Sequence, residues 1–143
     1  EQDNGAGIAE GVNMKTRVFT SGVLLYNGKI LIIKRGPTAP RNPNMWDGSG
    51  GHLNENESAE DCMLREAKEE CGLDVTIKKT GPVYEFIDEY GRAISIPFLL
   101  ESFSDRVRLS EEHVDYKWVE PRELGNYNCV RDLLENVKIF GLV

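Results

Sequence analysis

The acidic segment between residues 55 and 70 is the feature that most restricts how this chain can fold. It holds seven acidic residues and only two basic ones. On a helix with about 100° between successive residues, Glu66, Glu69 and Glu70 fall within roughly a third of the circumference. Carboxylates that close repel one another, more strongly when buried. A hard divalent cation that takes oxygen ligands removes this repulsion. The segment therefore predicts a metal-binding helix face, with a solvated acidic surface as the alternative interpretation.

The expected helix has recognisable ends. Ser58 followed by Asp61 has the capping-box pattern, and Gly72 suits the position just beyond the last turn. These signals predict a helix over residues 59–71. Its apolar residues recur every four positions and are expected to pack on a sheet: Ala59, Met63, Ala67 and Cys71.

The order of residues within this segment is far more specific than its charge. It resembles the signature of the Nudix hydrolases, G-x5-E-x7-R-E-U-x-E-E-x-G-U, in which U is aliphatic. Over residues 51–73 the fixed positions are filled by Gly51, Glu57, Arg65, Glu66, Glu69, Glu70 and Gly72, with Ala67 and Leu73 as the aliphatic positions. The resemblance implies a MutT-like pyrophosphohydrolase. Its expected reaction is the cleavage, by water attack at phosphorus, of a diphosphate linkage in a nucleoside diphosphate derivative.

The resemblance also implies roles for individual residues. It gives catalytic roles to the carboxylates of Glu66, Glu69 and Glu70. Glu57 and Arg65 are implied to have supporting roles in catalysis. The implied metal ligands are Glu66, Glu69, Glu70, the carbonyl oxygen of Gly50, and one glutamate from a later loop. For that last ligand we select Glu112, with its neighbour Glu111 as the alternative. The expected cofactor is Mg²⁺, which Mn²⁺ is able to replace.

Substrate binding is predicted from residue type. Arg35 and Arg41 flank a long loop over residues 36–51 and are suited to clamp a phosphate, and Gly51 permits close approach of the backbone to a ligand. The aromatic residues Trp46, Tyr84 and Tyr90 are candidates for stacking on a base, with a place in the core as the alternative. Two substrate classes stay open, dinucleoside polyphosphates and nucleoside triphosphates.

Two further function classes compete with the hydrolase. One is an isomerase on the same fold, such as isopentenyl diphosphate isomerase, which needs a catalytic cysteine ahead of the signature. The region before Gly51 has no cysteine. The other is a catalytically inactive Nudix-fold module that binds nucleotides or regulates. Such modules commonly lack signature carboxylates, whereas Glu66, Glu69 and Glu70 are all present.

Composition sets the remaining limits. A chain of 143 residues is the size of one domain, which we place at residues 14–143 behind a flexible tail or non-native leader over residues 1–13. The net charge of −7 argues against binding a nucleic-acid backbone. No apolar run approaches a membrane span, and three cysteines without CxxC spacing are typical of reduced thiols in the cytoplasm. We expect a monomer or homodimer.

The remaining pattern predicts an α/β (or α+β) fold, which by resemblance is a Nudix-type α/β/α sandwich with a mixed sheet. Asn27 and Gly28 indicate a hairpin between the first two strands. The expected strands cover residues 17–26, 29–35, 75–79, 83–87, 93–101 and 116–119, with a hairpin turn at 89–92. A second helix is expected over residues 130–138, with an apolar face formed by Val130, Leu133, Leu134 and Val137.

Overall fold

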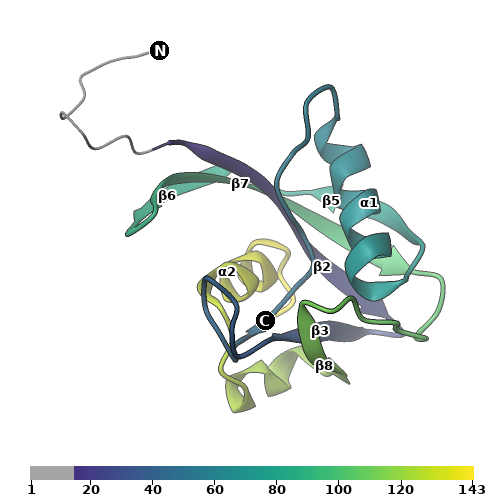
Figure 1. Ribbon diagram of the computed structural model, residues 1–143. Helices are drawn as coiled ribbons and strands as arrows, with labels where there is room; N and C mark the ends of the chain where they lie inside the picture. The colour runs from purple at the N-terminus through teal and green to yellow at the C-terminus, as the bar shows by residue number, and fades with distance from the viewer. Residues whose placement is uncertain (1–14) are drawn as a thin grey trace.

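Two long strands that pair in parallel form the centre of the sheet (Figure 1). In the computed structural model, which describes residues 15–143, β2 (Arg17–Tyr26) lies beside β7 (Gly91–Ser102), with Leu24 opposite Leu100. β2 turns back into β3 (Lys29–Arg35) through Asn27 and Gly28. Both turn residues have positive φ angles, 50° and 78°, as the tight hairpin predicts.

The other strands extend this centre on both sides. They are β4 (Trp46–Asp47), β5 (Val75–Thr80), β6 (Tyr84–Asp88) and β8 (His113–Val119). Within the described residues the sheet has seven strands in the order β4-β3-β2-β7-β5, with β6 on β7 and β8 on β3. All pairs except β2–β7 are antiparallel, so the sheet is mixed, as predicted.

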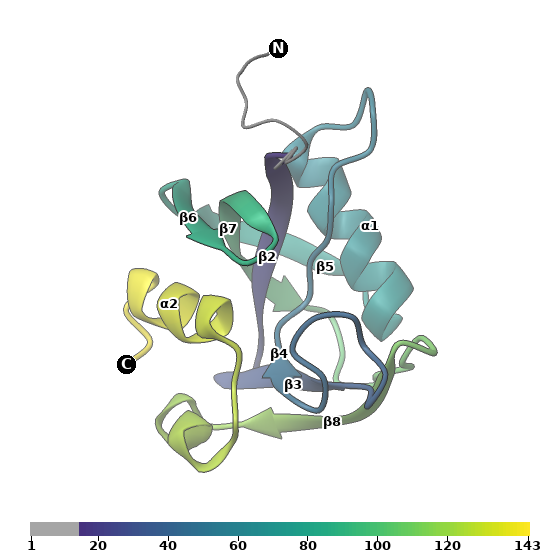
Figure 2. The ribbon, with the colours of Figure 1, turned by 60° about the vertical axis from the view of Figure 1, so that its left-hand side comes forward.

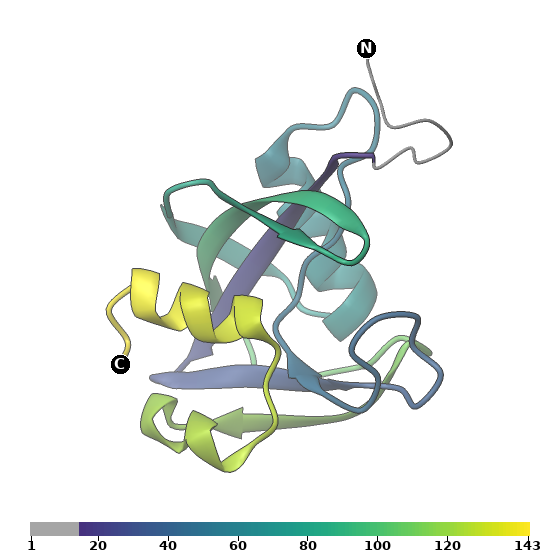
Figure 3. The same ribbon diagram turned by 90° about the vertical axis from the view of Figure 1, so that its left-hand side faces the viewer.

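The two α-helices cover opposite faces of the sheet. α1 (Ala59–Cys71) lies on one side of β2 and α2 (Arg131–Ile139) on the other (Figures 2 and 3). β3 shows why both faces are apolar. Ile30 and Ile32 belong to the core cluster that holds Leu133 of α2, whereas Leu31 and Ile33 belong to the cluster that holds Met63 of α1. A strand covered on both faces reads as a continuous apolar run rather than as an alternating one.

α1 begins and ends as its sequence predicts. The hydroxyl of Ser58 accepts a hydrogen bond from the amide of Asp61, and Gly72 ends the helix with a φ of 70°. Met63, Ala67 and Cys71 are buried against the sheet. Gly22 of β2 permits this close packing, because a β-carbon there would meet the Met63 side chain. On the neighbouring face of α1, Glu66 and Glu70 lie against residues 49–51 beside β2.

Several boundaries differ from the predictions. The long loop contains the short strand β4, and a 3-10 helix, η1 (Pro121–Asn126), precedes α2. β8 begins at His113 rather than at residue 116 because its pairing with β3 continues past a register shift to Arg35.

The apolar face of α2 also differs. Leu134 is exposed and the buried position belongs to Asn136, whose amide bonds the hydroxyl groups of Ser21 and Tyr84. Val130 is buried but caps the helix from outside it.

The predictions from composition differ in how far the structure tests them. The expected tail over residues 1–13 lies outside the described residues. Cys62, Cys71 and Cys129 are buried and free, as expected for reduced thiols. In residues 15–143 no helix has the length and apolar character needed to cross a bilayer. The cytoplasmic location and the oligomeric state stay predictions.

Candidate active site

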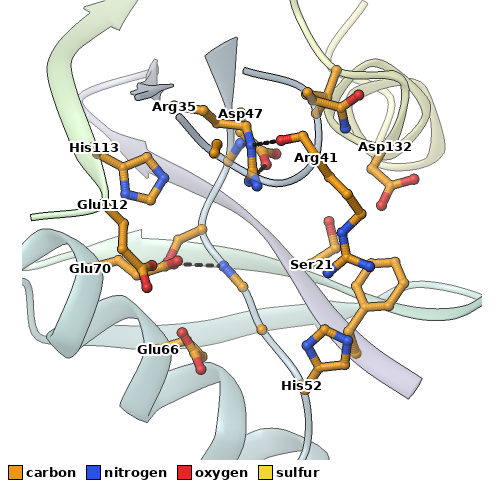
Figure 4. A pocket seen from close by; sticks show the side chains of 18 of the residues that line it. Ser21, Arg35, Arg41, Asp47, His52, Glu66, Glu70, Glu112, His113 and Asp132 are labelled. Atoms are coloured by element: carbon orange, nitrogen blue, oxygen red, sulfur yellow. Dashed lines mark hydrogen bonds and ion pairs between the residues drawn. The ribbon is translucent and has the colours of Figure 1, made fainter. Parts of the chain in front are cut away.

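A pocket of about 1260 Å³ opens beside the acidic face of α1 (Figure 4). Its walls come from β2, the end of β3 with the loop at residues 36–42, the glycine-rich residues 47–52, α1, β6, residues 110–114, and the start of α2. Acidic residues gather at one end, where Figure 4 shows Glu66, Glu70 and Glu112 beside His113. Arg41 and Asp132 lie at the other end.

The glycine-rich loop is held beside β2 and holds Glu70 in turn. The amide of Gly22 donates to Ser49 (2.6 Å) and the amide of Thr20 donates to Gly51 (2.8 Å). From this fixed loop, the hydroxyl of Ser49 donates to Glu70 Oε1 at 2.7 Å and the amide of Gly50 donates to the same oxygen at 3.0 Å. The Glu70 carboxylate is therefore oriented before any ligand binds.

Glycine is required at two positions of this loop because a side chain there would overlap neighbouring atoms. A β-carbon on Gly50 would overlap the backbone oxygen of Thr20, and one on Gly51 would overlap the carboxylate of Glu66. The loop thus lies against both the strand and the acidic helix. Ser49, just before these glycines, supplies a side-chain hydrogen bond to Glu70.

The segment before β8 reaches the acidic face because it docks on the C-terminal end of α1. The amides of Arg108 and Ser110 donate to the carbonyl oxygens of Cys71 (2.8 Å) and Glu70 (3.1 Å). These are carbonyl groups that a helix end leaves without intrahelical partners. Glu111 and Glu112 then both line the pocket.

Arg65 organises the signature glutamates. Its Nε and Nη2 bind both oxygens of Glu57, at 2.6 and 3.0 Å, and its Nη1 donates to Glu66 at 2.9 Å and Glu69 at 3.1 Å. The Arg65 hydrogen bonds, aided by the amide of Asn54, lower the pKa of Glu57 to about 2. Glu57 and Arg65 lie outside the pocket lining, which suits the supporting role expected of them.

The acidic end is electrostatically crowded. Burial raises the pKa of Glu70 to about 8, and the negative charges of Glu66 and Asp47 act in the same direction. Burial also raises the pKa of Glu66. Burial, together with the charge of Arg35, lowers the pKa of His113 to about 4. Burial and the neighbouring charges thus favour a protonated Glu70 and a neutral His113 in the absence of a cation.

The donor set fits a hard divalent cation. Within residues 15–143, Glu70, Glu112 and His113 offer ligand atoms that all lie within 4.8 Å of one another. Buried carboxylates that repel each other become ionised and stable beside a cation, which inverts the local electrostatics. Glu66 lines the same end. Glu69 also lines the pocket, but its side chain is 59% exposed and pairs with Arg65.

The predicted phosphate-binding arginines both line the pocket, together with Gly51. Arg35 binds Asp47 through Nη1 at 3.2 Å and the carbonyl oxygen of Arg41 through Nε at 2.8 Å. Figure 4 shows the Arg41 side chain extending from its loop toward Ser21 and His52.

The structure favours the core interpretation for Trp46, and it places Tyr84 outside the pocket lining. Trp46 is 8% exposed and packs edge-on against Tyr127, because β4 holds it in the core on the α2 side. The hydroxyl of Tyr84 donates to Asn136 at 3.0 Å, which holds the ring outside the pocket lining. Tyr90, at the β6–β7 turn, is 45% exposed and also lies outside the lining.

Several pocket residues escaped sequence reasoning. They are Arg17, Phe19, Asp47, Arg131 and Asp132. Burial raises the pKa of Asp132 to about 6, with the charge of Asp47 adding to the shift. These residues come from separate strands and from α2, and only the topology brings them together.

The raised pKa of Glu70 makes the metal-free protein sensitive to pH. An unfolded glutamate ionises near pH 4.3, so between that pH and about 8 the folded state binds the extra proton. Stability must then fall as pH rises through this window. His113 acts in the opposite direction, but only between about pH 4 and 6.5. Burial also raises the pKa values of Glu66 and Asp47, which therefore act in the same direction as Glu70.

We therefore expect the melting temperature of the metal-free protein to fall from pH 6.5 to pH 8, and the fall to be smaller in Glu70→Gln. Thermal denaturation in chelator at several pH values measures both slopes. Equal slopes in the two proteins would contradict the assignment to Glu70.

Comparison with known proteins agrees with the fold. The NUDIX domain model matches residues 16–137. The chain is 26% identical over 142 residues to the nucleoside triphosphatase NudI of Escherichia coli O17:K52:H18, covering 91% of this chain and all of that protein.

Solved structures are similar as well. The MutT protein of Methanosarcina mazei Go1 superposes with a TM-score of 0.77 at 25% identity, covering 90% of this chain and 96% of that one. A bifunctional NMN adenylyltransferase/ADP ribose pyrophosphatase of Francisella tularensis, solved with AMP and a Mn ion, gives a TM-score of 0.76 at 21% identity, over 90% of this chain and 42% of that one.

The α/β/α sandwich and the acidic pocket beside α1 define a nucleotide pyrophosphatase of MutT-like type. The chain belongs to the Nudix hydrolase family. It is homologous to the nucleoside triphosphatase NudI, and members of its family typically use divalent metals.

Proposed function

We propose that this protein is a Mg²⁺-dependent hydrolase that cleaves a diphosphate linkage in nucleoside triphosphates by water attack at phosphorus. One observation carries the proposal: carboxylates from α1 and from the segment before β8 converge at one end of a pocket that bears arginines elsewhere on its walls. Such an arrangement suits a metal-bridged polyphosphate, which needs oxygen ligands for the cation and guanidinium groups for the remaining phosphate oxygens.

The pocket has room and chemistry for a nucleoside as well. Its volume of about 1260 Å³ exceeds the 300–1,000 Å³ that is usual for small ligands. At the end away from Glu70, Phe19 and Phe86 line the wall with rings 6.4 Å apart, and Asp132 offers a hydrogen-bonding carboxyl group. This end suits a nucleobase, with an apolar ring against one face and a polar group at its edge.

Two observations favour a nucleoside triphosphate over a dinucleoside polyphosphate. The curated relative is a nucleoside triphosphatase, and Tyr90, the residue that suggested a second base, lies outside the pocket lining. The test is a substrate panel with Mg²⁺ that includes common and oxidised nucleoside triphosphates, dinucleoside polyphosphates, ADP-ribose, NADH and sugar nucleotides, with products identified by mass. Preference for a dinucleoside polyphosphate would overturn the substrate class.

The protein groups have separable tasks in this proposal. Glu66, Glu70, Glu112 and the carbonyl oxygen of Gly50 would hold the cation, while Ser49 and the Gly50 amide fix the Glu70 carboxylate. The cation, when bound, offsets phosphate charge and favours ionisation of water. Glu69 is the more exposed carboxylate and could accept a proton from water. Arg65 and Glu57 keep the glutamates in position, and Arg35 and Arg41 bind phosphate oxygens.

The site of bond cleavage is a separate prediction. The pocket lining offers carboxylates but no cysteine. Its Ser49 donates to Glu70, a bond to which we assign the orientation of that carboxylate rather than the activation of a nucleophile. We therefore expect no covalent enzyme intermediate and direct attack of water on phosphorus. A single turnover in ¹⁸O-labelled water should place the label in one phosphate-containing product. Label in the sugar or base, or a trapped phospho-enzyme, would contradict this mechanism.

A further inference from the structure

The turn between β6 and β7 contacts the loop at residues 36–44 across the mouth of the pocket. The hydroxyl of Tyr90, in that turn, donates a hydrogen bond to the carbonyl oxygen of Pro40 at 3.4 Å. The turn and the loop are 50 residues apart in sequence. The contact therefore joins two segments that the sheet hydrogen bonds do not connect.

The ring of Tyr90 also contacts two guanidinium groups. The Arg41 guanidinium lies 5.5 Å from the ring centroid and that of Arg17 lies 5.8 Å from it. Both distances are within the range of cation–π attraction. Arg17 is further fixed by an ion pair with Asp88 at 2.7 Å and a hydrogen bond to Gly91. Tyr90 thus contacts one arginine that is fixed by other bonds and a second one, Arg41, that belongs to the loop.

Of the two arginines that contact Tyr90, Arg41 is the one whose charge is available to bind a ligand. It lines the pocket, and within residues 15–143 it forms no ion pair with a carboxylate. The base of its loop is tied to β3 and β8, through the Arg35 Nε bond to Arg41 and the Gly36 amide bond to Glu112. The side chain of Arg41 extends beyond those ties, so the Tyr90 ring is what its guanidinium rests on.

We propose that Tyr90 is a positioning residue that holds the loop at residues 36–44 and aims Arg41 into the pocket at the substrate phosphates. The proposal rests on the proposed function for the role of Arg41, but the contact between loop and turn stands without it. It replaces base stacking as the role of Tyr90. The ring supplies the attraction for Arg41, and the hydroxyl adds the bond to Pro40.

The contact is tested without substrate by limited trypsin digestion. The bond after Arg41 is a tryptic site in the loop, and release of the loop should expose it. We expect Tyr90→Ala to be cut there about 5- to 30-fold faster than wild type, the range for losing one cation–π contact and one hydrogen bond between the turn and the loop. Tyr90→Phe keeps the ring and should stay within about threefold of wild type. Tyr116→Ala, which removes an exposed tyrosine from β8, is the matched control and should be cut at the wild-type rate.

The aiming of Arg41 is tested by steady-state kinetics with Mg²⁺ and the fastest-hydrolysed of the common nucleoside triphosphates. We expect Tyr90→Ala to raise KM about 5- to 30-fold with little change in kcat, because the change removes binding rather than chemistry. Arg41→Ala should raise KM by at least as much. The double variant should match Arg41→Ala alone, since Tyr90 acts through Arg41.

The outcomes separate the two proposals. Equal cleavage of wild type and Tyr90→Ala would overturn the loop contact. Additive effects of the two substitutions on KM would overturn the action through Arg41. Faster cleavage of Tyr90→Ala, in a protein whose wild type hydrolyses none of the nucleotides tested, would support the loop contact and overturn the hydrolase proposal.

Discussion

Replacing Glu70 by glutamine is expected to lower kcat by about 10²- to 10⁴-fold, the range for losing a positioned acid–base or charge-stabilising group. Glutamine has nearly the same shape, and its amide oxygen can still accept from Ser49 and Gly50. The substitution therefore removes the charge and leaves the hydrogen bonds. Since burial and like charges oppose the ionised form of Glu70, the metal-free fold should be as stable as wild type or slightly more stable.

Two further substitutions make the result specific. Glu69→Gln should show a loss in the same range if that carboxylate accepts a proton. Glu60→Gln, an exposed acid in the first turn of the same helix, is the control and should keep wild-type rates. The measurement is kcat and KM with the preferred substrate of the panel, with circular dichroism to verify folding. Wild-type kinetics in both Glu69→Gln and Glu70→Gln would leave the acidic face without a catalytic role.

The sequence was most informative where function and local structure use the same residues. The signature predicted α1 to the residue because Ser58 and Gly72 mark its ends and the buried stripe has helical spacing. The hairpin at Asn27 and Gly28 was equally local, since its two positive φ angles are a property of the turn itself. These elements depend on short-range geometry, which a single sequence records.

Predictions failed where long-range contacts decide which side chains are buried. Trp46 has the residue type of a stacking platform, yet β4 pairs with β3 and its backbone bonds Asn128 and Val130, and so the ring lies in the core. Nothing local distinguishes that outcome from an exposed ring. The same holds for Leu134 and Asn136 on α2, where hydrogen bonds from Tyr84 and to Ser21 make a polar residue the buried one.

The choice between Glu111 and Glu112 could be predicted only in part from the sequence. The family pattern indicated a glutamate in this segment, and both side chains line the pocket. The structure favours Glu112 because its carboxylate, with Glu70 and His113, belongs to the group of ligand atoms within 4.8 Å of one another. That grouping follows from the docking of the segment on the end of α1, through backbone bonds that side-chain identity does not encode.

Removing divalent cations is expected to have the largest effect, a loss of at least about 10³-fold in turnover, since a positioned charge-stabilising group is typically worth 10²–10³ and the cation would also position the substrate. Without a cation, the acidic end offers an anionic polyphosphate no positive charge, and every carboxylate there that is ionised repels the phosphates in a partly buried site, where screening by solvent is weak. Arg17 and Arg35 offset little of this, because they already pair with Asp88 and Asp47. Arg41 lies at the other end of the pocket, away from Glu70 and Glu112.

The experiment compares turnover in excess EDTA with turnover after back-titration by Mg²⁺ or Mn²⁺, both of which should restore activity. Binding is measured independently as the rise in melting temperature with added Mg²⁺, since a ligand bound only by the folded state stabilises it. Glu70→Gln should weaken that rise, whereas Glu60→Gln should not. Full turnover in EDTA would exclude the cation from the reaction. A normal Mg²⁺-dependent rise in Glu70→Gln would instead place the cation on other ligands, because a neutral amide is a much weaker partner for Mg²⁺ than a carboxylate.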